Sequence, residues 1–202
     1  MNITIVGCGK VGQKLAQQLS REKEHDITVV DILRSSIIDT TNKNDVMGVV
    51  GSGTNIDTLI EAETDKADIL IAVTGSDEVN LLACLMAKKL GDCKTIARVR
   101  KPEYRKAMRL LKEDLGLAMI INPERAEAAE IARLLRFPSA IQIDTFAKGR
   151  IEILKLKIPA DSPLDNLKIA DMTAKLNCDV LVCGVERGKD AFIPGGNFVL
   201  QA

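Results

Sequence analysis

The sequence predicts an α/β protein, in which a Rossmann-like doubly wound parallel sheet is followed by a small α+β subdomain. Two observations lead to this fold class. From residue 2 to residue 137, short runs rich in Val and Ile alternate with amphipathic segments of helical length, the pattern of βαβ units. After Pro138, strand-like runs follow one another with mainly turn residues between them. We therefore expect a nucleotide-binding domain over residues 1–137 and a second domain over residues 138–202, which we expect to be truncated.

Six strands are expected in the first domain, because six short apolar runs are each bounded by polar or turn residues. They cover Asn2–Val6, Asp26–Val30, Val46–Val50, Asp68–Val73, Thr95–Val99 and Ala118–Ile121. The run Asp68–Val73 has no polar alternation within it, as expected of a parallel strand that is covered on both faces.

Helices are expected between these strands wherever apolar residues recur at spacings of three and four. The clearest runs from Val79 to Leu90 and is followed by Gly91, a typical C-terminal cap. A second begins at Pro102, keeps the same spacing and stops before Gly116. The last helix of the domain is expected from Glu124 to Phe137, since a proline follows directly.

The second domain is expected to contain four strands and one short helix. The strands cover Ile141–Phe146, Arg150–Ile158, Val180–Val185 and Ala191–Ile193, and the helix covers Leu167–Leu176. Hairpin connections are expected at Ala147-Lys148-Gly149 and at Arg187-Gly188-Lys189-Asp190.

The composition argues against several classes of protein. The 202 residues contain 28 basic and 28 acidic side chains and only 2% aromatic residues, so we expect no nucleic-acid partner. Five cysteines without C-x-x-C spacing and one histidine, His25, indicate neither a disulfide framework nor a zinc site. The chain opens on a strand-like run without a signal peptide, and its apolar stretches are too short for a bilayer. We expect a cytoplasmic protein without direct membrane insertion.

The strongest motif is a glycine-rich loop between the first strand and the first helix. Gly7-Cys8-Gly9-Lys10-Val11-Gly12 fits the G-x-G-x-x-G pattern. In that pattern the first glycine permits a tight turn, the second lets the backbone approach a pyrophosphate, and the third lets the helix pack closely on the strand. The helix N-terminus adds partial positive charge.

Asp31 ends the second strand, about 20 residues after the glycine loop, where a carboxylate can accept hydrogen bonds from ribose hydroxyls. A carboxylate also repels a 2′-phosphate, which disfavours NADP, although Arg34 could offset part of that repulsion. ATP and ADP carry the same ribose and pyrophosphate as NAD(H). The motif therefore predicts NAD(H) or ATP/ADP as a bound ligand and leaves the choice open.

Further candidates for ligand binding lie at the ends of other strands, because ligands of open α/β sheets bind beyond the carboxyl ends. They are Ser52, Gly53, Thr54, Thr74, Gly75, Arg98 and Arg100. The two arginines would share a face of a strand and could contact phosphate oxygens. The alternative is that they begin a solvated basic helix, since basic residues dominate from Arg98 to Lys112.

Two questions about reactive groups remain. Cys8 at the helix N-terminus is either a redox-sensitive thiol or a small residue that fits the loop. A dehydrogenase would need an acid or base near the nicotinamide and a substantial substrate domain. The sequence offers neither, so no catalytic residue and no resident metal ligand is assigned.

The chain resembles the regulator of K⁺ conductance (RCK) domains, especially the Trk-type potassium-uptake regulatory subunits. The resemblance covers essentially the whole chain. It is carried by the glycine loop with Ile5 and Val6, by Val29-Val30-Asp31, Gly51-Ser52-Gly53-Thr54, Ala67-Asp68, Ala72-Val73-Thr74, Asp77-Glu78-Val79-Asn80-Leu81 and Asn122-Pro123-Glu124, and later by Ser162-Pro163-Leu164 and Ile193-Pro194.

This resemblance implies a regulator that is not an enzyme. Nucleotide bound in the Rossmann lobe would change the geometry of a homo-oligomeric ring built from dimers, and so open or close an attached membrane K⁺ channel or transporter subunit. The protein would lie at the inner face of the membrane through that partner. The resemblance also implies that Arg98 and Arg100 face phosphates, that the helix near Glu124 joins subunits, and that Glu124 helps to hold a divalent ion with the nucleotide.

The chain departs from the family pattern in two respects. Ser52 replaces the acid that commonly follows the glycine of the third strand. The family's C-terminal subdomain normally continues with another strand after a Gly-Asp pair, and this sequence stops before it. Because Trk-type subunits commonly carry two modules in tandem, the resemblance is compatible with a first module of two.

An NAD-dependent oxidoreductase is the alternative function.

Overall fold

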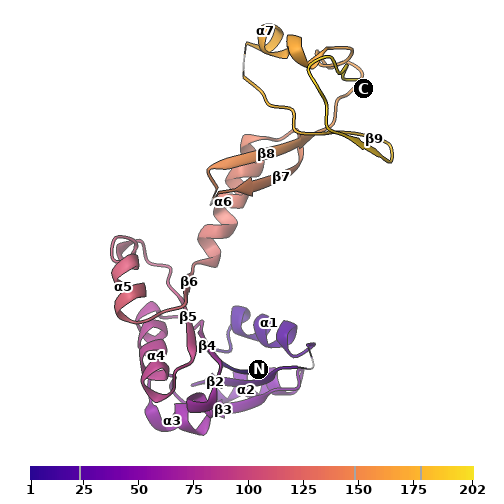
Figure 1. Ribbon diagram of the computed structural model, residues 1–202. Helices are drawn as coiled ribbons and strands as arrows, with labels where there is room; N and C mark the ends of the chain where they lie inside the picture. The colour runs from indigo at the N-terminus through magenta and orange to yellow at the C-terminus, as the bar shows by residue number, and fades with distance from the viewer. Residues whose placement is uncertain (23, 148, 178) are drawn as a thin grey trace. The chain divides into compact units, whose positions relative to one another are not determined.

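The computed structural model describes residues 1–22, 24–147, 149–177 and 179–202. The chain divides into two compact units, Met1–Ala129 and Glu130–Ala202, which are considered separately below (Figure 1). The predicted domain boundary at residues 137 and 138 stays a prediction.

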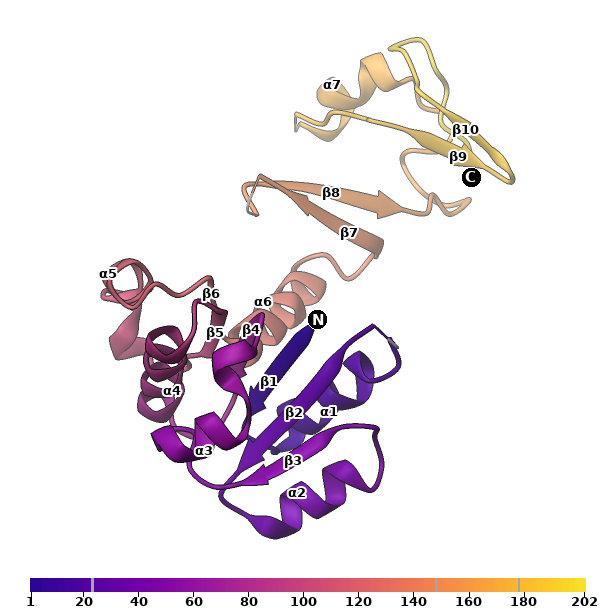
Figure 2. The ribbon, with the colours of Figure 1, turned by 60° about the horizontal axis from the view of Figure 1, so that its bottom comes forward.

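The first unit is built on a six-stranded parallel sheet, which confirms the predicted fold class. Its strands are β1 (Asn2–Val6), β2 (Asp26–Asp31), β3 (Met47–Val50), β4 (Ile69–Ala72), β5 (Lys94–Arg98) and β6 (Met119–Ile121). They lie in the order β3-β2-β1-β4-β5-β6, and every neighbouring pair is parallel (Figure 2). The strand order reverses between β1 and β4, where open α/β sheets bind their ligands.

Six α-helices connect or follow these strands. They are α1 (Lys10–Leu19), α2 (Arg34–Thr41), α3 (Ile56–Glu61), α4 (Asp77–Leu90), α5 (Met108–Asp114) and α6 (Pro123–Arg136), with a 3₁₀ turn at Thr64–Lys66. The single helix predicted from Pro102 to Leu115 is wrong in detail. A 3₁₀ turn over Pro102–Arg105 precedes α5, as is common where a helix begins.

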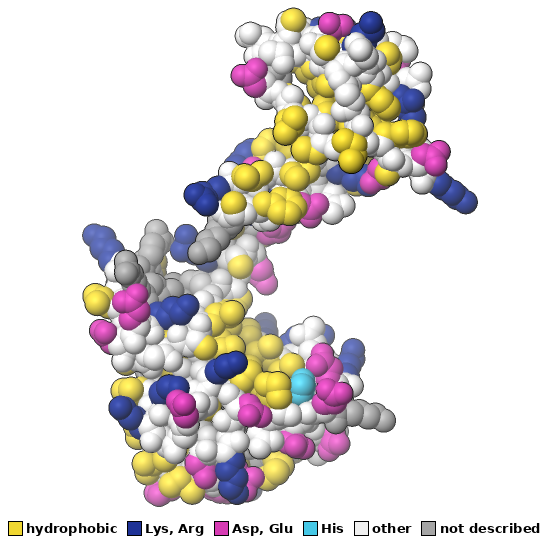
Figure 3. All heavy atoms as spheres, in the orientation of Figure 1, with side chains coloured by type: hydrophobic (Ala, Val, Ile, Leu, Met, Phe, Trp, Pro, Cys, Tyr) yellow, Lys and Arg dark blue, Asp and Glu magenta, His cyan; other side chains and the backbone are white. Residues whose placement is uncertain are grey.

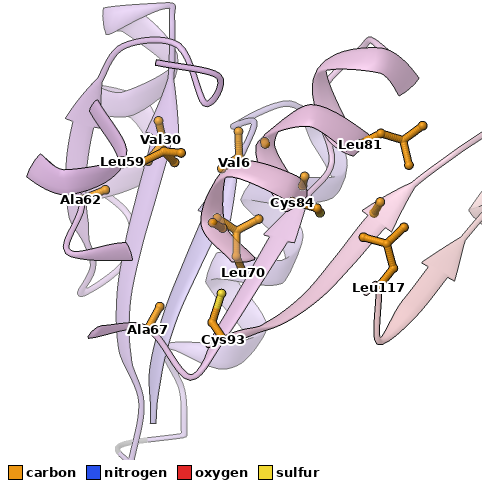
Figure 4. Packing of buried hydrophobic residues seen from close by; sticks show 14 of the residues in the cluster. Val6, Val30, Leu59, Ala62, Ala67, Leu70, Leu81, Cys84, Cys93 and Leu117 are labelled. Carbon is orange, nitrogen blue, oxygen red and sulfur yellow. The ribbon is translucent and has the colours of Figure 1, made fainter. Parts of the chain in front are cut away.

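The core of the first unit lies on both faces of the sheet, because consecutive side chains of a strand point to opposite faces. Val6 and Leu70 point to the face that α3 and α4 cover, where they meet Leu59 and Cys84 (Figure 4). Neighbouring positions such as Ile5 point to the opposite face, in the cluster to which α1 contributes Ala16 and α2 contributes Ile37.

The second unit contains two antiparallel hairpins and a small apolar core. β7 (Ala140–Phe146) pairs with β8 (Ile151–Leu156), and β9 (Val185–Arg187) pairs with β10 (Asp190–Phe192). A 3₁₀ turn at Ile169–Asp171 and helix α7 (Met172–Leu176) lie between the hairpins in sequence. The core is formed by Leu167, Met172 and Leu200.

One predicted strand of the second unit is wrong, because residues 180–184 form no strand and β9 begins only at Val185. The partner strand β10 ends at Phe192, shortly before Pro194, whose nitrogen cannot donate a ladder hydrogen bond. Residues before Val185 therefore have no strand opposite them. The predicted turn at Arg187–Asp190 is present, with Gly188 at φ +60°. The other predicted connection includes Lys148, which lies outside the described residues, as does Cys178.

Basic and acidic side chains are interspersed over the face drawn in Figure 3, in agreement with a formal net charge of zero. In the described part of the chain, no helix combines the length and the apolar character needed to cross a membrane.

Candidate nucleotide-binding site

The three glycines of the motif that joins β1 to α1 have different local reasons to be glycine, and Gly12 already lies within α1. Gly7 has a φ of +103°, and a Cβ atom there would lie 2.8 Å from the backbone nitrogen of Thr74. A Cβ atom on Gly12 would lie 1.8 Å from the carbonyl oxygen of Gly7, so α1 approaches the loop backbone directly. Gly9 differs, because a Cβ atom there would meet nothing within 4 Å. The space beside Gly9 is therefore open to a ligand.

Gly9, which borders this open space, is also the N-cap of α1. Gly9 has no side chain to cap the helix, and its carbonyl oxygen accepts a hydrogen bond from the Gln13 N–H at 2.9 Å. The first N–H groups of a helix have no partner within the helix. Together with the partial positive charge of the helix end, they favour an anionic group in the space beside Gly9.

Asp31, the last residue of β2, is joined directly to the glycine loop. One oxygen of its carboxylate accepts a hydrogen bond from the Cys8 N–H at 2.6 Å, and the other accepts one from the Leu33 N–H at 2.8 Å. A carboxylate has about four acceptor positions, so capacity remains for ribose hydroxyls. Sequence reasoning placed Asp31 near the ribose but missed its bond to the loop.

Cys8 is buried, with 1% of its surface exposed, in the core cluster on the α1 and α2 face. Burial, the largest cause, and the negative charge of Asp31 both raise the pKa of its thiol, a hydrogen bond with Thr40 lowers it, and together these effects give a pKa of about 11. At neutral pH the thiol is protonated and weakly nucleophilic. Of the two interpretations of Cys8, these properties favour a small residue that fits the loop.

This burial gives a testable expectation for thiol chemistry. Iodoacetamide at pH 7.5 should modify the exposed Cys183 in the folded protein and leave Cys8 unmodified. Peptide mass spectrometry after timed quenching measures each cysteine separately, and a sample alkylated in denaturant provides the control in which Cys8 reacts. Alkylation of Cys8 in the folded protein at the rate of Cys183 would contradict the assignment of Cys8 as an inert core residue.

The residues after β3 lie beside Asp31, because the Gly51 N–H donates to the Asp31 carbonyl oxygen at 2.9 Å. The hydroxyl groups of Ser52 and Thr54 share a hydrogen bond of 2.9 Å. A Cβ atom on Gly53 would lie 2.2 Å from a methyl group of Val6. Gly53 is therefore required by packing against β1, and the two hydroxyl groups are the polar groups that this strand end offers.

Thr74 and Gly75 follow β4, next to the glycine loop. The Thr74 N–H and hydroxyl group both donate to the side-chain oxygen of Asn80, at 2.8 and 2.7 Å. A Cβ atom on Gly75 would meet nothing within 4 Å. As at Gly9, the backbone at Gly75 borders open space.

Arg98 and Arg100 lie at the end of β5, and both guanidinium groups have acidic neighbours. Arg98 forms an ion pair with Glu124 in the first turn of α6, and its Nε is buried with no hydrogen-bond partner among the described residues. Arg100 donates to the Gly75 carbonyl oxygen and lies 3.4 Å from the Asp77 carboxylate. Both arginines precede α5, so they do not begin the solvated helix that was the alternative interpretation.

Glu124 faces the same end of the sheet. Burial raises the pKa of its carboxyl group, but hydrogen bonds from its own backbone N–H and from Arg98 outweigh that effect and hold the pKa below its usual value. Glu124 is therefore an anion at neutral pH.

Among the described residues, no group of three or more His, Cys, Asp or Glu side chains could hold a metal ion.

Two residues of this region were not predicted as site residues. Asp77 and Asn80 lie in the first turn of α4, and both are fully buried although their side chains are polar. The sequence did give a signal for them, because Asp77 ends the polar group after the fourth strand and both residues belong to the segment Asp77–Leu81 that carries the family resemblance. His25 lies before β2, away from the carboxyl ends of the strands, where it contacts Glu22 at 3.1 Å.

The sheet order and the glycine loop define a Rossmann-like domain, and comparisons with known proteins define its family. The TrkA-N domain model matches residues 3–123, and the TrkA-C domain model matches residues 153–202. The chain therefore belongs to the TrkA-N family.

Curated relatives carry the same family name. The chain is 36% identical over 204 residues to the Trk system potassium uptake protein TrkA homolog of Archaeoglobus fulgidus. It is 35% identical over 206 residues to the Trk system potassium uptake protein TrkA of Halomonas elongata. Each alignment covers 100% of this chain but only 45% of the relative, so the chain spans less than half the length of these proteins.

Solved structures share the fold at lower identity. The GsuK RCK domain superposes with a TM-score of 0.59 at 21% identity, covering 99% of this chain and 42% of that one. The TrkA-N domain of the inner membrane protein ybaL from Escherichia coli gives a TM-score of 0.57 at 21% identity, covering 66% of this chain and 96% of that one.

Proposed function

We propose that this chain is a nucleotide-binding regulatory module that gates a K⁺ uptake channel or transporter by binding NAD(H) or ATP/ADP. The observation that carries the proposal is the open space at Gly9, next to an uncapped helix N-terminus and the carboxylate of Asp31. A pyrophosphate at the helix end and a ribose at Asp31 are the two groups that every adenine nucleotide of this kind presents.

The names of similar proteins support the same ligand class. One structure of this fold is described as the GsuK channel bound to NAD, and another as GsuK bound to ADP. The curated relatives are named for potassium uptake. In our proposal the nucleotide is a ligand and is not consumed. Its partner is the membrane K⁺ channel or transporter subunit, at the inner face of the membrane.

A homo-oligomer is part of the proposal, because the second unit exposes large apolar side chains. Ile131, Leu134 and Leu135 of α6 are between 53% and 77% exposed, and the β7–β8 hairpin exposes Ile141 and Phe146. Exposed large apolar side chains favour association with another surface where they form a continuous patch. A dimer that assembles into a ring would bury them and would give nucleotide binding a geometry to change.

The test is a calorimetric titration of the chain with NAD⁺, NADH, ATP and ADP. We expect saturable binding of at least one of them at a stoichiometry of one per chain. Incubation with NADH and candidate ketones or aldehydes, followed at 340 nm, tests the oxidoreductase alternative, and sustained loss of absorbance would favour it. Failure of all four nucleotides to bind would overturn the proposed function.

Arg100→Ala is expected to weaken ATP binding by about tenfold and NAD⁺ binding by less. Arg100 lies beside Gly75, beyond the glycine loop, where a terminal phosphate of ATP would extend. Lys101→Ala is a suitable control, because it removes a neighbouring positive charge whose side chain pairs with Glu78. Equal losses for both nucleotides on Arg100→Ala would contradict this position for Arg100.

A further inference from the structure

The first turn of α4 holds buried polar side chains to which the proposed function gives no role. Asp77 and Asn80 are both fully buried, and α4 packs on β4 and β5. A polar side chain in such a place is costly unless its hydrogen bonds are made. Their hydrogen-bond partners are therefore informative.

Asn80 uses both ends of its side-chain amide. The oxygen accepts hydrogen bonds from the N–H and the hydroxyl group of Thr74, at 2.8 and 2.7 Å. The nitrogen donates to the carbonyl oxygen of Arg98 at 2.9 Å and makes a longer bond of 3.4 Å to the Thr74 carbonyl oxygen. One side chain thus ties the end of β4 to the end of β5.

Both of these strand ends belong to the candidate site. The backbone of Thr74 contacts Gly7 so closely that a Cβ atom on Gly7 would lie 2.9 Å from the Thr74 Cα. Arg98 carries one of the two guanidinium groups at the site. Asp77 also holds the chain that follows β5, because its carboxylate accepts hydrogen bonds from the backbone N–H groups of Arg100 and Lys101, both at 2.8 Å.

We propose that Asn80 is a positioning residue of the nucleotide site, which sets the glycine loop through Thr74 and the arginine-bearing end of β5 through the Arg98 carbonyl. This inference rests on the proposed function. Asn80 itself is covered by protein and does not contact the ligand. The role requires an amide, because the two donor groups of Thr74 face one end of the Asn80 side chain and the carbonyl oxygen of Arg98, an acceptor, faces the other.

The substitution Asn80→Asp separates this role from simple space filling. An ionised carboxylate of the same shape can still accept from Thr74 but cannot donate to the Arg98 carbonyl oxygen. Burial raises the pKa of an introduced carboxyl group, although Arg98 and Arg100 oppose that effect and Asp77 adds to it. When protonated, the introduced group can donate as the amide does.

The experiment is a titration of the full chain with ADP at pH 6.0 and at pH 8.5, for the wild type and for Asn80→Asp. We expect the variant to bind ADP about tenfold more weakly than the wild type at pH 8.5, and to approach the wild type at pH 6.0. The ratio of the two ADP affinities at each pH cancels the effect of ionisable groups that both proteins share. Equal affinity of the two proteins at both pH values would overturn the inference.

Controls separate positioning from stability. Leu59→Ala removes a fully buried core side chain of α3 on the same face of the sheet, and it should lower the thermal midpoint while leaving ADP affinity within about twofold. If Asn80→Asp does not fold, Asn80→Ser gives an uncharged alternative that is expected to weaken ADP binding. If neither folds, Asn80 serves the fold as a whole and the positioning role is overturned.

The two proposals fail in different ways. If the wild type binds no adenine nucleotide, the proposed function and this inference both fail. If the wild type binds ADP, Asp31→Ala does not, and Asn80→Asp matches the wild type at pH 8.5, only the inference about Asn80 fails.

Discussion

Asp31→Ala is expected to weaken the binding of ADP and NAD⁺ by at least about 100-fold, because hydrogen bonds to a charged group contribute about 1.5–3 kcal/mol each and a ribose offers two hydroxyls. The substitution also removes the acceptor of the Cys8 N–H, which lies in the glycine loop. Ribose and phosphate recognition should therefore fail together. Calorimetric titration at a temperature where both proteins are folded measures the loss.

Two further variants test the cause of that loss. Asp45→Ala removes an equal charge from an exposed position before β3, at the amino ends of the strands, whereas Asp31 lies at the carboxyl end of β2. This variant should bind nucleotides as the wild type does. Asp31→Asn keeps one side-chain oxygen but removes the charge that repels a 2′-phosphate. It should narrow the gap between NAD⁺ and NADP⁺ affinity. An Asp31→Ala chain with wild-type affinity would refute the assignment of Asp31 to the ribose.

The strands of the first unit could be predicted because parallel strands that are buried on both faces leave a strong local signal. Every residue from Ile69 to Ala72 is apolar, and the structure makes them β4, one residue shorter at each end than expected. The same signal failed at residues 180–184, which are equally apolar but form no strand. A strand also needs a partner strand. The partner here, β10, ends shortly before Pro194, and the apolar run at residues 180–184 contains no sign of that limit.

The candidate site was predictable only in part, for a related reason. The glycine loop and Asp31 follow a local pattern with a fixed spacing, so residue types and positions in the sequence were enough to select them as candidates. Asn80 bonds to residues 6 and 18 positions away in the sequence, and Arg98 pairs with Glu124, 26 positions away. Those contacts depend on which strands are neighbours in the sheet. A single sequence contains no local pattern that reports them.

Gly12→Ala is expected to give the largest loss of stability among the glycine-loop variants. The added methyl group would lie 1.8 Å from the Gly7 carbonyl oxygen, which is backbone and cannot rotate away. A backbone clash this close lies at the upper end of the roughly 1–3 kcal/mol that overpacking costs, and the better helix propensity of alanine returns about 1 kcal/mol. A net loss of about 2 kcal/mol corresponds to a thermal midpoint roughly 4–8 °C lower, which calorimetry or circular dichroism measures.

Gly9→Ala is the matched variant in the same loop and should separate binding from folding. Gly9 has a φ of −72°, which alanine adopts readily, and the new methyl group would meet no protein atom within 4 Å. Its thermal midpoint should stay near that of the wild type. The methyl group would nevertheless occupy the space that a pyrophosphate needs, so ADP and NAD⁺ binding should fall by at least about tenfold. The position of the phosphates was inferred from the open space at Gly9. If Gly9→Ala binds both nucleotides as the wild type does, the added methyl group does not meet the phosphates, and they do not lie against this loop.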